Sequence, residues 1–278
     1  MALSTWTQHE QQSQVTGSVW DAATTTQLNP IGQRVQLGDG RVFRYASTDS
    51  NVGVGDVLAS TPNVQEVAAG EFGADGSTAP AADNGGSVGD NTIQINIVTG
   101  THTITKDEFA GGYLQIKNGM GEGYNYRILE NEANAASGTS TITLKEGLIV
   151  ALDNTSEGVL VGNPYDNVVT HTAANYGGTP TESIMGTAVR TSTAGTDSTT
   201  EYIWVQTWGM AAVQAGTATI IQGGPVQPAE DDNGSAQIPV ATEAEIQHIG
   251  TCYAGSTDAA ATVIADGSWG PVILQIMP

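Results

Sequence analysis

The chain of 278 residues is long enough for one large domain or for two to three small ones, and it is rich in glycine (35 residues) and poor in charged side chains (13%). Such a composition offers too little Leu, Lys, Arg and Glu for long helices and favours strands joined by many turns. The net charge of -21, from 8 Lys and Arg against 29 Asp and Glu, repels nucleic-acid phosphates and anionic membranes, so we expect direct binding to neither.

Targeting and redox signals are weak in this sequence. The single cysteine, Cys252, excludes an intramolecular disulfide framework, and its alternating surroundings predict a small buried side chain. No stretch approaches the about 20 apolar residues of a membrane span. The first residues, up to Trp6, have neither a positive region nor an apolar run. We therefore expect no secretory signal, and folding in a cytoplasm.

Residues 1–33 are expected to form an extended N-terminal arm. Gln, Ser and Thr dominate this stretch, and Trp6 and Trp20 are isolated apolar anchors within it. A segment of such low apolar density does not fold alone. We therefore expect it to lie across a neighbouring surface, which another subunit could provide.

Residues 34–90 are expected to form a β-hairpin region followed by a loop. Two alternating stretches, 34–37 and 41–45, flank an Asp-Gly turn, which is a strong hairpin signal. The apolar spacing in 62–69 favours a short helix. Residues 70–90 are Gly, Ala, Asp and Ser with nearby prolines, which indicates a surface loop or linker.

Residues 91–166 are expected to form a small β-barrel or sandwich domain. Ile93, Ile95 and Ile97 alternate with polar residues and so share one face of a strand. Several short strands in about 75 residues are typical of a compact barrel. The strands expected here cover 92–98, 112–116, 124–129, 139–144 and 148–152.

Residues 167–278 are expected to form a C-terminal β-domain with long acidic turns. An apolar-Gly-Thr stretch followed by a polar turn and a strand occurs twice, first from Ile184 and again from Ile249. A shared local hairpin explains this short match as well as a true duplication does. The whole chain is thus predicted to be all-β, with several short-stranded barrel- or sandwich-like domains and the extended arm.

No catalytic constellation, phosphate-binding loop or dinucleotide fingerprint is present. The four histidines are scattered without ligand spacing. Calcium stays open because oxygen ligands abound, although the DxDxDG pattern is missing. We therefore expect a protein that is not an enzyme and that has no cofactor and no predicted metal ligands.

The tryptophans are the most informative single residues. Alternate strand positions send aromatic side chains into a core or a subunit interface, where they are enriched. A sugar-binding platform is the alternative for exposed aromatics on a β-scaffold. The residues expected at an interface are Trp6, Trp20, Trp204, Trp208 and Trp269.

Short segments in a fixed order, spread over most of the chain, resemble the capsid decoration (cement) proteins of tailed bacteriophages. They are Leu37-Gly-Asp-Gly-Arg-Val-Phe-Arg-Tyr-Ala46, Gly111-Gly-Tyr-Leu114, Gly121-Glu-Gly-Tyr-Asn-Tyr-Arg127, Val161-Gly-Asn-Pro-Tyr-Asp166, and Tyr202-Ile-Trp-Val-Gln-Thr-Trp-Gly209 with the following Gly216-Thr217. None of them is a catalytic signature, which agrees with a structural role.

The resemblance implies a protein that binds the outside of an assembled icosahedral shell and reinforces it against internal DNA pressure. It further implies the major capsid protein as the partner, a homotrimer, and a place on the capsid exterior of the virion after assembly in the host cytoplasm. Two alternatives stay open at this point. One is another virion component, such as a tail, fibre or capsid subunit, and the other is a carbohydrate-binding adhesive module.

Overall fold

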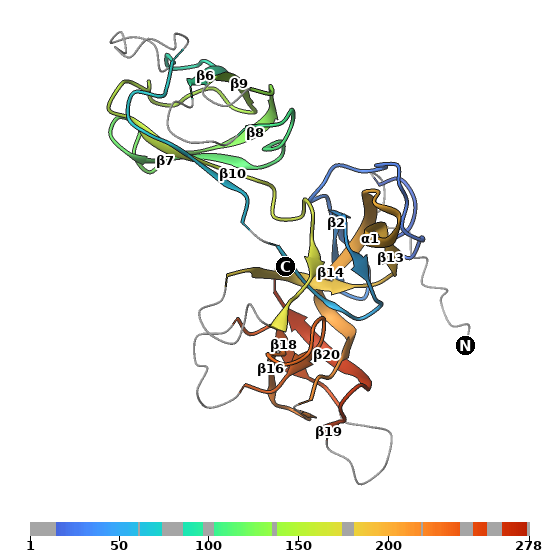
Figure 1. Ribbon diagram of the computed structural model, residues 1–278. Helices are drawn as coiled ribbons and strands as arrows, with labels where there is room; N and C mark the ends of the chain where they lie inside the picture. Colours follow the sequence, from blue (N-terminus) through green and yellow to red (C-terminus); the bar gives the residue numbers. More distant parts are fainter. Residues whose placement is uncertain are drawn as a thin grey trace, which may run out of the picture. The chain divides into compact units, whose positions relative to one another are not determined.

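The structure of the protein is a computed structural model (Figure 1). It describes residues 15–60, 62–73, 86–96, 103–134, 138–173, 181–217, 219–239, 247–254 and 263–276. Within these stretches strands in antiparallel sheets dominate, and the only helix is α1 (Ala194–Asp197). The predicted all-β class is confirmed. None of the helical structure in the described stretches is long enough to cross a bilayer.

Two compact units divide the chain. Unit 1 comprises Met1–Thr61 and Pro164–Pro278, and unit 2, Pro62–Asn163, is inserted between these two parts. The expected ranges 34–90 and 91–166 cut across this division. The two units divide the range 34–90 after Thr61, whereas the change in composition begins at residue 70.

Unit 1 is built around one large sheet with the strand order β11-β4-β12-β14-β20-β18-β16-β17. Strand β2 also pairs with β14, and β1 pairs with β2. The strands of unit 1 are β1 (Arg34–Gln36), β2 (Val42–Thr48), β3 (Asn51–Val52), β4 (Val57–Ser60), β11 (Val169–Thr170), β12 (Ser183–Ala188), β13 (Ser192–Thr193), β14 (Glu201–Gln214), β15 (Ile220–Ile221), β16 (Pro225–Pro228), β17 (Ala236–Gln237), β18 (Gly250–Cys252), β19 (Val263–Ile264) and β20 (Trp269–Gln275).

Unit 1 contains two structural repeats that share β14. Repeat A consists of β2, β3, β4, β11, β12, β13 and the first half of β14, and repeat B consists of the second half of β14 and β15 to β20. The two sets follow the same chain order and make the same five pairings. The matching pairs are β2–β14 and β14–β20, β3–β13 and β15–β19, β4–β11 and β16–β17, β4–β12 and β16–β18, and β12–β14 and β18–β20.

The turn before the β4 and β16 strands is the same in both repeats. Gly55 has φ +83° and Gly223 has φ +76°, a conformation that glycine adopts without the steric cost of a Cβ atom. The Gly55 amide donates to the Ala188 carbonyl at 2.8 Å, and the Gly223 amide donates to the Cys252 carbonyl at 2.8 Å. Equal geometry at equal positions supports the assignment of two repeats.

The repeated Gly-Thr pattern in the sequence falls on this larger repeat. Thr187 lies opposite Val57 in repeat A, and Thr251 lies opposite Pro225 in repeat B. The two patterns therefore occupy equivalent strands in equivalent register. Of the two explanations, a duplicated unit accounts for the structure, whereas a shared local hairpin would not reproduce five pairings.

The buried cores of the two repeats also correspond. One apolar cluster contains Leu58, Met185 and Val205 of repeat A. The other contains buried side chains of repeat B together with Val57, Ala59 and Ile184 of β4 and β12. Cys252 is 1% exposed, so the prediction of a buried thiol is confirmed. Equivalent buried pairs are Val52 and Ile220, Leu58 and Val226, Met185 and Ile249, Ala188 and Cys252, and Val205 and Val272.

The described part of the N-terminal arm, residues 15–33, lies on the chain's own repeat A. Val19 is buried, Thr24 forms a bridge with Tyr202, and the Leu28 amide donates to the Tyr45 hydroxyl at 3.1 Å. The neighbouring surface that the arm was expected to cross is thus, for these residues, the face of β2 and β14. Residues 1–14 lie outside the described residues.

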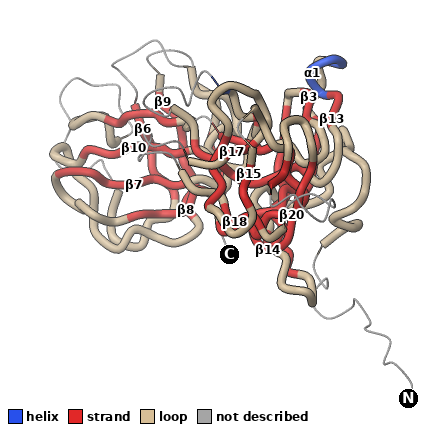
Figure 2. The backbone as a smooth tube through the Cα atoms, turned by 90° about the horizontal axis from the view of Figure 1, so that it is seen from below, coloured by secondary structure: helices blue, strands red, loops and turns tan. Residues whose placement is uncertain are grey.

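Unit 2 is a curled six-stranded sheet of order β5-β10-β7-β8-β9-β6 (Figures 1 and 2). Phe72 bridges to Ile95 of the last strand, and the Asn96 amide donates to the Glu71 carbonyl at 2.7 Å, so the sheet bends back on itself. One cluster of fifteen buried side chains fills the interior. The strands are β5 (Val64–Val67), β6 (Thr92–Asn96), β7 (Tyr113–Asn118), β8 (Asn125–Asn131), β9 (Thr139–Leu144) and β10 (Glu157–Val161).

Two of the predicted elements are wrong. Residues 62–69 contain β5 rather than a helix, because Val64 to Val67 pair with β10 and tertiary pairing overrides the apolar spacing. Residues 148–152 form no strand. Leu148 and Leu152 are buried four residues apart, and their amides donate to carbonyls of the 86–90 loop. The predicted hairpin at 34–45 and the strand 139–144 are confirmed.

Replacement of Phe72 by Ala should destabilise unit 2 strongly. Phe72 is 2% exposed, and removal of a buried Phe ring costs about 3–5 kcal/mol through lost burial and the cavity left behind. Chemical denaturation followed by circular dichroism measures the effect. The control Val88→Ala, at a position 66% exposed in the same unit, should change stability by less than about 0.5 kcal/mol. Equal shifts for the two variants would contradict the packing described.

Candidate functional site

The structure divides the expected interface tryptophans between two surfaces of unit 1. Trp20 and Trp204 belong to repeat A, where Trp204 is 5% and Trp20 is 38% exposed. Trp208 and Trp269 lie on the sheet of repeat B, and Trp269 is 55% exposed. Trp6 lies outside the described residues. The described tryptophans therefore do not form a single site.

The repeat A face is an aromatic surface covered by residues 15–33. Phe43, Tyr45 and Trp204 are buried there together with Val19 of the covering segment. The ring centroids of Tyr45 and Trp204 are 5.0 Å apart at 63°, an edge-to-face arrangement. This face is already occupied by the chain itself.

Trp20 fastens the edge of the covering segment. Its ring meets Phe43 edge to face at 5.5 Å, and the Arg41 guanidinium lies 4.9 Å from its centroid. The Arg190 side chain donates to the Trp20 carbonyl at 2.6 Å. These contacts assign Trp20 to holding the segment rather than to an open surface.

A small pocket remains between the segment and the sheet. Its volume of about 20 Å³ is room for roughly one water molecule. Asp21, Tyr45, Tyr202 and Trp204 are among the residues that line it. It is too small for a substrate or cofactor.

The repeat B face, the outer side of β14, β20 and β18, has no such cover among the described residues. Residues directly opposite one another in an antiparallel pair point to the same side of the sheet. The side chains on this face, which lies opposite the repeat B core, are Trp208, Met210, Ala212, Gln214, Pro225, Thr251, Tyr253, Trp269, Pro271, Ile273 and Gln275.

The repeat B face is apolar and carries no ionisable acid or base apart from the tyrosine hydroxyl. Met210 is 39%, Tyr253 is 60% and Trp269 is 55% exposed. The Trp269 indole donates to the Val54 carbonyl at 3.2 Å, which fixes the ring against the neighbouring loop. In a chain with a net charge of -21, an exposed sheet face of this kind has the character of a protein contact surface.

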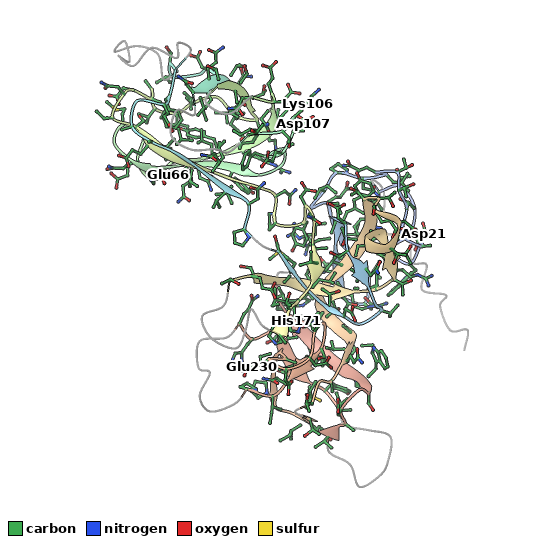
Figure 3. The ribbon with its side chains drawn as sticks, viewed as in Figure 1. Asp21, Glu66, Lys106, Asp107, His171 and Glu230 are labelled. Atoms are coloured by element: carbon green, nitrogen blue, oxygen red, sulfur yellow. The ribbon has the colours of Figure 1, made fainter. Side chains whose placement is uncertain are left out.

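A buried polar cluster lies elsewhere in unit 1, around His171 (Figure 3). The imidazole Nε2 is 2.8 Å from the Ser235 carbonyl, and Nδ1 is 4.0 Å from a Glu182 carboxylate oxygen. Burial lowers the pKa of His171, which outweighs the opposite effects of the Ser235 carbonyl and the Glu182 carboxylate. Burial likewise raises the pKa of nearby Asp56.

This cluster fastens a loop to the sheet. A histidine beside a carboxylate is a common acid–base pair, but the side chains of His171 and Glu182 are only 0% and 1% exposed, so a substrate does not reach them here. The Val57 amide donates to the Gly234 carbonyl at 2.7 Å, and the Gly234 amide donates to the His171 carbonyl at 3.1 Å. The arrangement therefore connects the 229–235 loop to β4 and β11.

Metal binding finds no support in the described residues, among which no three His, Cys, Asp or Glu side chains converge. His9 and His102 fall outside the described stretches, and His171 and His248 are far apart in the sequence. Burial raises the pKa of the Cys252 thiol, which disfavours the reactive thiolate.

Comparison with protein-family models, with curated proteins and with solved structures finds no match for this chain.

Sequence reasoning identified Trp208 and Trp269 but missed the rest of the repeat B face. Met210, Ile273 and Tyr253 alternate with buried residues along their strands, and that alternation was the available signal. Which strands lie side by side depends on pairing between residues far apart in the chain, such as Met210 and Ile273. A single sequence does not reveal such pairing.

Replacement of Tyr45 by Phe should loosen the covering segment. The change removes only the hydroxyl that accepts the Leu28 amide hydrogen bond, and such a bond contributes about 0.5–1.5 kcal/mol. Denaturation midpoints measure the loss. Tyr113→Phe, at a hydroxyl of unit 2 that is 42% exposed as a residue, serves as the matched control and should leave the midpoint unchanged. An equal effect of both substitutions would argue against the contact.

Stability should fall as the pH drops below about 6.5, the ordinary pKa of histidine. The unfolded chain protonates His171 near that pH, whereas the folded chain does so only at a lower pH because its pKa is lowered. Acid therefore favours unfolding in this window. Denaturation at a series of pH values measures the slope, and His171→Gln should reduce it. His248→Gln is the control at an exposed position and should keep the slope. An unchanged slope in His171→Gln would refute the assignment.

Proposed function

We propose that this protein is a virion structural protein that binds the outer surface of a tailed-phage capsid and stabilises it as a decoration protein. The major capsid protein is the proposed partner, a homotrimer is the proposed assembly, and the capsid exterior is the proposed location. The proposal assigns no catalytic step, cofactor or metal to the chain.

The observation that carries the proposal is the exposed repeat B face. An uncharged sheet face with Trp269, Tyr253 and Met210 at its surface suits contact with another protein, since its burial removes apolar area from water without desolvating a charge. The antiparallel strands beneath it hold these side chains in a fixed register. Such a surface suits a protein that works in an assembly of several chains.

The segments that resemble decoration proteins agree with this role. The stretch from Leu37 to Ala46 forms the turn and most of strand β2, and Tyr202 to Gly209 lies in the first part of β14. Both belong to the sheet that carries the two faces. A trimer would present three copies of each contact to the shell, so that individually weak contacts act together.

A carbohydrate-binding adhesive module is the second candidate, because Tyr253 and Trp269 are exposed aromatics on one sheet face. Sugars stack on open aromatic rings, but the Trp269 indole nitrogen is already engaged with the Val54 carbonyl. Measurable binding to a glycan array, lost on Trp269→Ala, would favour this candidate. The same face then serves a different ligand.

Incubation with undecorated capsids tests the main proposal. The purified protein, of 28.6 kDa per chain, should co-sediment with capsids of its own phage and reach saturation at a fixed number of copies per shell. Capsids that already carry their full complement serve as the control and should bind no more. The decorated shells should also resist heating better, because a ligand that binds only the assembled state stabilises it.

Protein that stays in the supernatant with undecorated capsids would refute the decoration role. Binding that grows without saturation would do the same, since it would indicate nonspecific adhesion. In either event the tail, fibre and carbohydrate-binding alternatives become the leading candidates.

A further inference from the structure

The two repeats present equivalent sheet faces that differ in one respect. In repeat A the face is covered by residues 15–33 of the same chain, whereas the equivalent face of repeat B has exposed aromatic and aliphatic side chains. Because the strand pairings and registers match, each position on one face has a counterpart on the other. The comparison therefore shows what the bare face lacks.

The exposed fractions of matched side chains measure the difference between the two faces. Phe43 of repeat A is 0% exposed, and its counterpart Met210 is 39% exposed. Val189 packs against the covered cluster, and its counterpart Tyr253 is 60% exposed. Unit 1 thus contains two equivalent faces, and the described residues cover only the one in repeat A.

The occupant of repeat A indicates what kind of ligand such a face holds. Residues 15–33 form no regular strand, and they bury Val19 against the sheet, bridge from Thr24 to Tyr202 and close over Tyr45. The face therefore binds an extended polypeptide with an isolated apolar anchor. A ligand of the same type fits the uncharged face of repeat B.

We propose that the repeat B face binds residues 1–14 of a second copy of this chain, with Trp6 as the apolar anchor. This segment precedes the covering residues 15–33 directly and has the same composition, rich in Gln, Ser and Thr. Glu10 is its only acidic residue, and it has no Lys or Arg. A segment with so few charges can be buried against the uncharged face with little cost from the desolvation of charged groups.

The number of segments and faces in each chain supports a second copy as the source of the segment. Each chain has one such segment and one face that the described residues leave uncovered, so exchange between copies covers every face. A contact between different patches of identical chains is heterologous and closes into a ring when the rotation allows. The inference rests on the proposed function in that it assigns the repeat B face to the contacts within the proposed trimer, and the trimer as a whole binds the shell.

Full-length variants test the exchange. Trp6→Asp removes the anchor and leaves the face intact, whereas Met210→Asp places a charge in the face and leaves the segment intact. We expect wild-type protein to have a mass of several chains by light scattering and each variant to have the mass of one chain, 28.6 kDa. Ile149→Asp, at a position 60% exposed in unit 2, is the control and should keep the wild-type mass.

A mixture of the two variants gives the sharper result. The intact segment of Met210→Asp should bind the intact face of Trp6→Asp, which restores one contact and yields a two-chain species. Tyr253→Asp should reproduce Met210→Asp in this assay, and circular dichroism checks that each variant is folded. Wild-type protein of single-chain mass, an unchanged mass of Trp6→Asp, or a mixture that remains single chains would each overturn the inference.

The mass measurements need no capsids, so this inference and the decoration role fail separately. A chain that is monomeric in every variant yet saturates undecorated shells would retain the decoration role and lose the exchange. A chain that exchanges its N-terminal segment but leaves capsids bare would retain the exchange alone.

Discussion

Strand β14 is the constraint on which unit 1 depends. Its fourteen residues take part in both repeats, first paired with β2 and β12 and then paired with β20. Val205 and Val213 face the two cores, and Trp204 and Met210 face outward. A slip of one residue would reverse all of these positions, so a single strand fixes which side of each repeat is available for contact.

The same repeat explains how unit 2 can be inserted. In repeat B the strands equivalent to β4 and β11 are joined by the short loop 229–235, whereas in repeat A unit 2 occupies that connection. Because β4 and β11 pair with each other, the ends of any insertion start close together and the entropic cost of closing it is small. The buried His171 cluster lies beside these strands and holds the 229–235 loop against them.

Local signals predicted much of this fold, and nonlocal pairing accounts for what they missed. The turn at Asp39 and the alternation in 139–144 depend on neighbouring residues, and both predictions were right. The segment 62–69 was wrong because its strand exists only through pairing with β10, almost one hundred residues away. In the sequence the repeat is visible only as the two Gly-Thr patterns. Outward-facing side chains such as Tyr45 and its counterpart Ala212 differ between the repeats, although their strands pair in the same register.

Divergence of those outer positions is also what makes the two faces different. Large rings at Phe43, Tyr45 and Trp204 hold the chain's own segment permanently in place. At the counterparts Met210, Ala212 and Pro271 the side chains are smaller, so contacts at these three positions bury less apolar area and are weaker. A weak contact that is repeated in an assembly can form and correct itself reversibly, whereas a strong one would trap misassembled chains. With the proposed exchange, one fold has a face covered by its own chain and a face that binds a second copy, and this combination suits the proposed decoration role.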